Sequence, residues 1–505
     1  MNPKNRPWNR REFLRSSVAA GAVLGAWSEA QAQDAKRPNI LFFIADDWGR
    51  NHASYFGAKW VNTPAFDRVA REGVVFSNCF TSNPKCCPSR ASILMGRNTW
   101  QTKETVNHYS IFPNEFAVYP DVLEKAGYFV GLTGKGWGPG DFKSTGWPHN
   151  PAGKEYQKRT LTPPYSGISN RDYAANFEDF LADRPAGTPF CFWMGPTEPH
   201  RAYEEGSGLR AGKNPADVTL PKYWPDNKTI RNDMLDYALE VEWVDRHLGL
   251  ALKKLEEIGE LDNTLLVVTS DHGMPFPRVK GQIYEDSFHI TMAVRWPTKS
   301  KGGRTVDDFI NFRDLAPTFC EAAGVPAAPT MTGKSFLDVL LSGKSGRVDE
   351  SRDVMLIGKE RHDLGRPNDW GYPVRAIRTR DFLYVRNYHP ERWPAGDPET
   401  GYRNVDGSPT KEFLLGSFDE YYRLSFGKRP AEELYHVSED PDCIHDLSGD
   451  LQFAQIKREL QERMNRMLRD DGDPRALGQE EYFETIQYTG PRKHAYDTWL
   501  KNREP

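Results

Sequence analysis

The sequence lacks a strong excess of charge of either sign, and it lacks long apolar runs. Its 505 residues carry 66 lysines and arginines against 70 aspartates and glutamates, which gives a formal net charge of −4. A nucleic-acid-binding surface needs a basic excess or stripe, so we expect no nucleic-acid partner. Beyond the N-terminal region no uninterrupted apolar run reaches the roughly 18 residues of a membrane-spanning helix, so we expect no transmembrane anchor. Hydrophobic residues still make up 38% of the chain, enough for a large core.

Cysteine is also scarce. The six cysteines are Cys79, Cys86, Cys87, Cys191, Cys320 and Cys443. They are too few for a disulfide scaffold in a chain of this length, which leaves a reactive role open for one or two of them. Short-period repeats are missing as well, which argues against a solenoid.

The N-terminus is typical of an exported protein. Arg10 and Arg11 precede an apolar stretch at 18–27 that ends in small residues. This pattern predicts a cleavable signal peptide over residues 1–32. The run NRREFL at 9–14 resembles the twin-arginine signal, which implies transport of the folded protein by the twin-arginine export machinery. We therefore expect a periplasmic or secreted bacterial protein. The alternative is an ordinary signal whose positive region holds two arginines by chance.

Strand-length apolar runs alternate with helical stretches in the first two thirds of the chain. The runs lie at 39–45, 128–133, 190–194 and 264–269. Continuous apolar runs of this length are typical of strands buried on both faces of a parallel sheet. A helix is expected at about 232–258, where apolar residues recur near the helical period. The pattern predicts an α/β fold with a mostly parallel sheet flanked by helices.

The sequence changes in character from about residue 342, where glycines and charged residues indicate a connection. Short apolar and aromatic strands follow at 374–378 and 382–385. We predict a larger α/β domain over residues 37–345 and a smaller C-terminal α+β domain with an antiparallel sheet over 350–505.

The run CCPSR at 86–90 is the most informative motif, and it continues as ASILMGR over 91–97. Together the two segments resemble the signature of the type I sulfatases. Met95 stands where threonine is usual in that signature, and Lys85 precedes the motif. The resemblance implies that a formylglycine-generating enzyme oxidises Cys86 to formylglycine.

The resemblance extends over almost the whole chain after residue 37 and is strongest to the sulfamidase (heparan N-sulfatase) branch. The segments that carry it are SDHGMPFP at 270–277, EPHR at 198–201 and YPVR at 372–375. It implies an alkaline-phosphatase-like α/β domain followed by a smaller domain, in agreement with the organisation predicted above. It also implies hydrolysis of a sulfate ester or sulfamate on a sulfated carbohydrate, such as a glycosaminoglycan fragment or an algal polysaccharide.

Possible metal ligands follow two of the predicted strands. Asp46 and Asp47 come directly after the first strand, and Asp271 and His272 follow the fourth. Ligands of parallel sheets bind beyond the carboxyl ends of the strands, and carboxylate oxygens suit Ca²⁺. The resemblance implies that these four residues and Cys86 hold one Ca²⁺. Because an imidazole nitrogen is a less natural calcium ligand than an oxygen, Mg²⁺ stays an alternative.

Four more residues receive catalytic roles from the resemblance. Arg90 is expected to neutralise the metal-bound carboxylates and to steady the hydrated aldehyde. Lys135 and Lys280 match the lysines that hold sulfate oxygens. His200 is the expected general acid for the leaving oxygen or nitrogen, since imidazole titrates near neutral pH. In the implied reaction one hydroxyl of the hydrated aldehyde attacks sulfur, and the second then loses its proton to expel sulfate.

Trp137 departs from the family pattern. Many sulfatases read Gly-Lys-x-His where this chain reads GKGW at 134–137, and their histidine contacts the hydrated aldehyde. This departure keeps a non-catalytic sulfoglycan-binding protein open as an alternative. A phosphonate or phosphate monoester hydrolase of the same superfamily is a second one. The segment that resembles the sulfamidase specificity region supplies the candidate substrate contacts Glu360, Arg361, His362 and Arg375.

Overall fold

The computed structural model describes residues 37–417, 419–491 and 493–503. The predicted signal peptide at 1–32 lies outside these residues. From Pro38 onward the chain forms one compact unit. Within the described ranges, no helix combines the length and the apolar character needed to cross a membrane.

A seven-stranded sheet lies at the centre, in the order β4-β6-β1-β7-β8-β2-β9. Its strands are β1 (Asn39–Ala45), β2 (Val74–Phe80), β4 (Phe129–Gly134), β6 (Phe190–Gly195), β7 (Thr264–Ser270), β8 (His289–Arg295) and β9 (Arg304–Asn311). Only β8 runs antiparallel to its neighbours among the described strands of this sheet. The four apolar runs of the sequence are β4, β6, β1 and β7, which lie side by side. Every residue of β1 and β7 is buried, which explains why these runs show no alternation.

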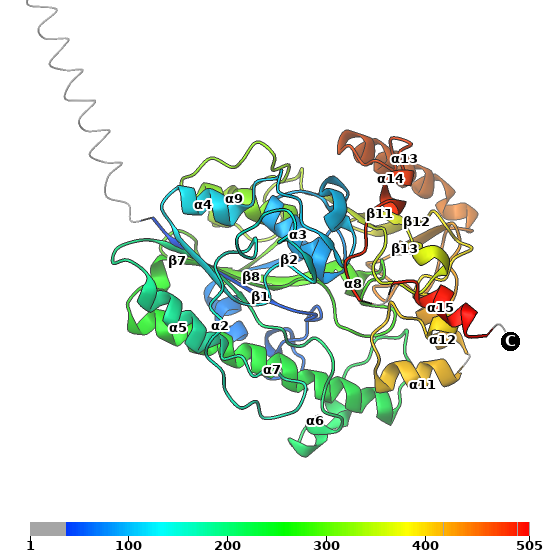
Figure 1. Ribbon diagram of the computed structural model, residues 1–505, viewed down its shortest axis with the longest axis horizontal. Helices are drawn as coiled ribbons and strands as arrows, with labels where there is room; N and C mark the ends of the chain where they lie inside the picture. The colour runs from blue at the N-terminus through cyan, green and yellow to red at the C-terminus, as the bar shows by residue number, and fades with distance from the viewer. Residues whose placement is uncertain (1–36, 418, 492, 504–505) are drawn as a thin grey trace, which may run out of the picture. The chain divides into compact units, whose positions relative to one another are not determined.

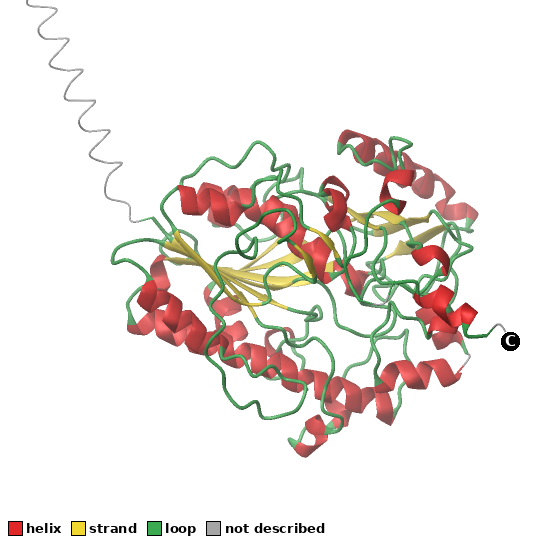
Figure 2. Cartoon of the chain, in the orientation of Figure 1, coloured by secondary structure: helices red, strands yellow, loops and turns green. Residues whose placement is uncertain are grey.

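Helices cover both faces of this sheet, as Figures 1 and 2 show. The larger helices are α2 (Pro64–Glu72), α3 (Cys86–Met95), α4 (Tyr119–Lys125), α5 (Tyr173–Asp183), α7 (Lys228–Glu257) and α9 (Leu315–Ala322). The helices α2, α5 and α7 pack on one face and share a core with Leu41 and Phe43 of β1. The helices α3, α4 and α9 pack on the other, against Ile40 and Phe42. The helix predicted near 232–258 is confirmed as α7.

A second, smaller sheet follows in the chain, and it is antiparallel with the order β10-β11-β12-β13. Its strands are β10 (Val354–Lys359), β11 (Val374–Thr379), β12 (Phe382–Asn387) and β13 (Glu432–His436), and helix α13 (Ala454–Asp470) packs on it. The minor elements are β3 (Ser110–Ile111), β5 (Gly140–Asp141), α6 (Ser207–Arg210), α8 (Glu285–Phe288), α10 (Leu337–Leu341), α11 (Pro409–Ser417), α12 (Glu420–Phe426), α14 (Glu481–Glu484) and α15 (Ala495–Lys501). The predicted fold class is confirmed by the two sheets. The division into domains at 37–345 and 350–505 stays a prediction.

Candidate active site

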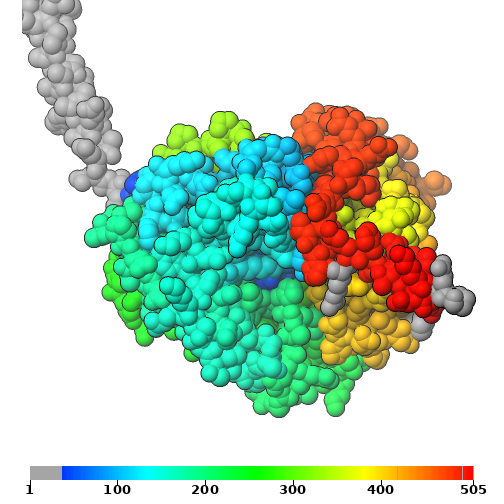
Figure 3. Space-filling view, in the orientation of Figure 1, coloured from blue at the N-terminus to red at the C-terminus, as the bar shows by residue number. Residues whose placement is uncertain are grey.

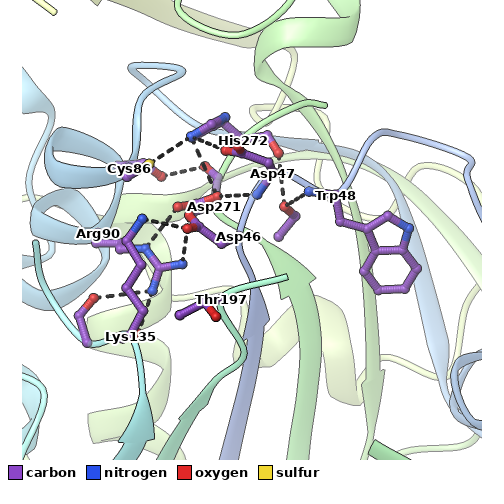
Figure 4. A network of polar contacts seen from close by, with 12 residues as sticks. Asp46, Asp47, Trp48, Cys86, Arg90, Lys135, Thr197, Asp271 and His272 are labelled. Atoms are coloured by element: carbon purple, nitrogen blue, oxygen red, sulfur yellow. Dashed lines mark hydrogen bonds and ion pairs between the residues drawn. The ribbon is translucent and has the colours of Figure 1, made fainter. Parts of the chain in front are cut away.

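The N-terminus of α3 lies beside the carboxyl ends of β1 and β7, and the motif at 86–90 forms its first turn (Figure 4). Lys85 is in extended backbone and Cys86 is the first helical residue. All ten residues of α3 are buried, and Cys86 is only 1% exposed. Arg90 follows one turn later, so its side chain lies on the same side of the helix as Cys86. The motif therefore presents position 86 to the edge of the sheet where the acidic residues lie.

Four possible metal ligands converge at this edge. One ligand atom from each of Asp46, Asp47, Cys86 and His272 lies within 4.8 Å of the others, and all four residues are buried. Asp47 Oδ1 lies 3.0 Å from His272 Nε2, yet it accepts no hydrogen bond from any residue that the structure describes. A buried carboxylate oxygen without a hydrogen bond is costly unless a cation binds it. The donor set fits a divalent cation.

Asp271 lies next to this group, and its carboxylate also contacts protein donors. Its Oδ2 accepts a hydrogen bond from Arg90 Nε at 2.8 Å, and its Oδ1 accepts one from the backbone N–H of Asp47 at 3.1 Å. Burial, with a further contribution from Asp46, raises the pKa of Asp271 to about 7 against the opposing effect of His272. The positive side chains of the protein therefore do not fully compensate the negative charge of these closely spaced carboxylates.

Three cationic side chains surround the carboxylates. Arg90 Nη2 lies 3.3 Å from Asp46 Oδ1, and Lys135 Nζ lies 2.6 Å from Asp46 Oδ2. Lys280 Nζ lies 2.6 Å from Asp47 Oδ2. The structure thus brings together the lysines and the arginine that the sequence analysis assigned to the site.

The field at position 86 favours negative charge. Burial and the nearby Asp46 raise the pKa of the Cys86 thiol, but Lys135, Lys280 and His272 outweigh both and hold it well below its usual value. Burial lowers the pKa of His272, but Asp271, Asp47 and Cys86 outweigh it and raise that pKa to about 9. Such a field suits the oxygens of a bound sulfate and an oxyanion on residue 86.

His200 lies on the wall of a pocket of about 420 Å³ that Lys280 also lines. Its Nδ1 lies 2.6 Å from the carbonyl oxygen of Arg201, so a proton on Nδ1 donates to that carbonyl and leaves Nε2 open. A ring nitrogen of His200 lies within 4.8 Å of carboxylate oxygens of Asp47 and Asp406. Figure 3 shows a hollow where cyan, green, orange and red segments meet, with blue atoms at its base.

Several residues of this pocket had no counterpart in the sequence analysis. They are His108, Asp363, Arg403 and Asp406, from loops that are distant in the chain. Lys85, which the sequence analysis noted only because it precedes the motif, also lines the pocket beside the expected site residues His200 and Lys280.

The candidate substrate contacts occupy a different environment. Arg375 is fully buried, binds both carboxylate oxygens of Asp473 at 2.8 and 2.9 Å, and lies 2.8 Å from Glu360. Arg361 donates to the carbonyl of residue 486, and His362 Nε2 lies 2.7 Å from the side-chain oxygen of residue 83. Other protein groups hold all four side chains, and none of the four is among the described residues that line the pocket.

Trp137 packs into the core beneath the site. Its indole N–H donates to the carbonyl of Cys87 at 3.1 Å, and its ring meets Phe112 edge-on at a centroid distance of 4.8 Å. The side chain is 3% exposed. Trp137 therefore supports the first turn of α3 from below.

Comparisons with known proteins identify the family of this chain. Residues 38–325 match the family described as Sulfatase. An ulvan-active sulfatase of Formosa agariphila is 28% identical over 88% of this chain and 82% of its own length. The human N-sulphoglucosamine sulphohydrolase is 27% identical over 87% of this chain and 91% of its own. An N-acetylglucosamine-6-O-sulfatase of Bacteroides thetaiotaomicron is 26% identical over 94% and 93% of the two chains.

Solved structures share the fold. One protein in complex with its substrate D-glucosamine-2-N,6-O-disulfate superposes with a TM-score of 0.63 at 22% identity, over 87% of this chain and 99% of its own. A phosphonate monoester hydrolase from Silicibacter pomeroyi gives the same TM-score at 18% identity, over 86% and 96%. The shared fold alone does not separate sulfate from phosphonate chemistry.

Proposed function

Because the chain belongs to the sulfatase family, which it matches over residues 38–325, we propose that it hydrolyses sulfate esters or sulfamates of a sulfated carbohydrate. The proposal includes a formylglycine made from Cys86 and one bound divalent cation. Its main support is the position of Cys86 at the start of α3, within 4.8 Å of ligand atoms of Asp46, Asp47 and His272. The relatives include enzymes named for ulvan, N-sulfoglucosamine and N-acetylglucosamine 6-sulfate.

Two groups complete the proposed site. A formylglycine at position 86 supplies, when hydrated, two hydroxyls on one carbon. A divalent cation, held by Asp46, Asp47, Asp271 and His272, supplies positive charge for the sulfate oxygens. Ca²⁺ is the first choice because most of these donors are carboxylate oxygens, and Mg²⁺ is the alternative.

The remaining charged residues of the site position the substrate and move protons. Arg90 holds the carboxylates of Asp46 and Asp271 in place through its two contacts. Lys135 and Lys280 lie where they can hold sulfate oxygens while they balance the carboxylates. His200, open at Nε2 on the pocket wall, delivers a proton to the departing oxygen or nitrogen.

Modification and export belong to the same proposal. Cys86 is 1% exposed in the folded chain, so a modifying enzyme has access to it only before folding. Export of a folded protein by the twin-arginine route then places the conversion by a formylglycine-generating enzyme in the cytoplasm. The mature enzyme is periplasmic or secreted.

Peptide mass spectrometry across residue 86 tests the proposed nucleophile. In protein made with a formylglycine-generating enzyme, we expect the peptide that contains residue 86 to be lighter than the unmodified peptide. The difference should equal the mass change from cysteine to formylglycine. A Cys86→Ala variant should bind metal and release no sulfate, whereas the matched Cys87→Ala variant keeps turnover. An active preparation in which residue 86 is an unmodified thiol throughout would refute the proposal.

Matched esters test the reaction. Sulfate and phosphate monoesters of one alcohol should be compared by their kcat/KM. We expect the sulfate ester to be preferred, and a wide preference for phosphate would assign the chain to phosphoryl chemistry. Retained binding of sulfated sugar without release of sulfate, in protein that carries formylglycine, would instead identify a sulfoglycan-binding protein.

A further inference from the structure

The walls of the pocket hold several charged side chains, and most of them are paired. Lys280 Nζ contacts Asp47 at 2.6 Å and Asp406 at 2.9 Å. Lys85 Nζ, in a side chain that is 2% exposed, lies 2.7 Å from Asp363 Oδ2. Both wall carboxylates, Asp363 and Asp406, therefore already neutralise a lysine.

Arg403 is the exception. It lines the same pocket and is half-buried, in the loop between β12 and α11. Among the described residues its guanidinium has neither a hydrogen-bond partner nor an ion-pair partner. A guanidinium presents a fork of N–H donors that matches the two oxygens of a carboxylate or a sulfate. A half-buried, unpaired arginine in a ligand pocket is thus an available site for an anion.

His108 supplies a second, independent observation on this wall. Its Nδ1 lies 2.7 Å from Asp363 Oδ1, which fixes the ring. Its Nε2 is buried and has no hydrogen-bond partner in the described part of the chain, although the residue is only 6% exposed. His108 is also one of the residues that line the pocket, and since buried polar atoms are normally satisfied, its unpartnered nitrogen is available to a polar group of a ligand.

The Arg403 loop and the His108 wall are joined. Asn404, the next residue after Arg403, donates from its side-chain nitrogen to the carbonyl oxygen of Asp363 at 2.7 Å. Tyr109 and Tyr488 line the pocket beside them, with ring centroids 5.3 Å apart. Aromatic rings next to polar groups present an apolar face on which a sugar ring can pack.

We infer that this pocket binds a second anionic group of the substrate, a sulfate ester or a carboxylate, on Arg403, while Nε2 of His108 binds a polar group of the same sugar. The inference rests on the proposed function, because the sulfate to be cleaved must lie at Cys86. The enzyme then selects sugars that carry an anion besides the sulfate under attack.

Calorimetric binding tests this inference without turnover. The Cys86→Ala protein is compared with Cys86→Ala/Arg403→Gln, using three probes. The first probe is glucosamine with a single sulfate, the second is glucosamine N,6-O-disulfate, and the third is a singly sulfated glucosamine joined to a uronic acid. We expect Arg403→Gln to lower the affinity for one doubly anionic probe, relative to the single sulfate, by roughly tenfold or more. A loss on the second probe identifies its second sulfate group as the group bound, and a loss on the third identifies a carboxylate.

Two controls complete the experiment. Arg466, exposed on α13, gives the matched variant Arg466→Gln, which should leave all three affinities unchanged. His108→Phe keeps a ring in the wall and should weaken all three probes by several-fold.

Two results would overturn the inference. One is an unchanged affinity of Arg403→Gln for both doubly anionic probes, and the other is an equal loss of affinity for all three probes. Failure of the proposed function is distinguishable, because it appears as absent sulfate release by the protein with an intact Cys86 while the Arg403 effect on binding persists.

Discussion

Two regions of this protein bury dense clusters of charge, and they differ in how those charges are satisfied. In the C-terminal region Arg375 lies between Asp473 and Glu360, and Arg475 binds Glu360 at 2.7 and 3.1 Å. Two arginines and two carboxylates balance one another through several short contacts. At the edge of the large sheet, Asp47 keeps an oxygen that accepts no hydrogen bond within the described part of the chain.

The difference shows how a buried charge cluster can be assigned to structure or to function. Charged side chains that are fully paired within the protein, as around Arg375, hold secondary-structure elements together and have no free hydrogen-bonding atom for a ligand. A buried charged side chain that is only partly paired lowers stability, and such a side chain is typical of a site where a ligand or a metal ion supplies the missing partner. In the same cluster, burial raises the pKa of Asp271 to about 7 although both of its oxygens accept hydrogen bonds.

The largest effect is expected at Asp47. Asp47→Asn keeps the size of the side chain but removes a charge that the cation requires, so kcat/KM should fall by about 10³-fold or more. Stability of the metal-free protein should change by less than about 1 kcal/mol, since Lys280 keeps Asp406 as a partner. Sulfate release and urea unfolding in chelator measure the two quantities. A large loss of stability with intact activity would show that this cluster stabilises the fold and does not serve the reaction.

Arg375→Met should have the opposite signature. It leaves Asp473 and Glu360 without their shared partner in the interior, so unfolding should become easier by about 3–5 kcal/mol. The activity of each folded molecule should stay within about twofold. Urea unfolding and active-site-normalised turnover report both, with exposed Arg466→Met as the control. A selective loss of substrate affinity in this variant would show that Arg375 contacts the substrate, as the sequence analysis expected.

Removal of the proposed cation should affect only the cluster at the edge of the large sheet. Chelation should abolish turnover and lower stability by about 2.7 kcal/mol, compared with protein at 100 times the dissociation constant of the metal. The Arg375→Met variant should lose the same amount of stability on chelation as the unchanged protein, because residue 375 lies outside the proposed metal site. Titration with Ca²⁺ and then Mg²⁺, followed by thermal unfolding and turnover, identifies the metal. Equal stability with and without metal would show that the carboxylates are not its ligands.

Glu240 of α7 extends the comparison to a buried acid outside both clusters. It is 2% exposed, one of its oxygens has no hydrogen bond among the described residues, and burial raises its pKa to about 9. Between pH 5 and 8 the folded state holds a proton that the unfolded state has lost. Stability therefore falls as pH rises, by about 1.4 kcal/mol per unit from this residue. Glu240→Gln should remove that slope in urea unfolding across this range, and an unchanged slope would show that Glu240 is ionised in the fold.

The proposed site residues that follow strands could be predicted from the sequence because their positions are set locally. Asp46 and Asp47 come directly after β1, and Asp271 comes directly after β7, so the parallel arrangement alone brings them to one edge. Cys86 and Arg90 share a helical turn. The residues of the pocket wall could not be predicted in this way. Asp363, Arg403 and His108 come from three separate loops, so no local pattern in the sequence relates them.

The sequence by itself determined the strands of the large sheet, the family signature at 86–90 and the acids at the strand ends. Each of these depends on residues that are neighbours in the chain or on the regular geometry of strands and helices. Only the tertiary structure decided which charges were already paired. It placed Arg375 against Asp473, 98 positions away, and left Arg403 facing a pocket. The energy of a buried charge depends on distances between atoms from remote segments, and no local pattern encodes those distances.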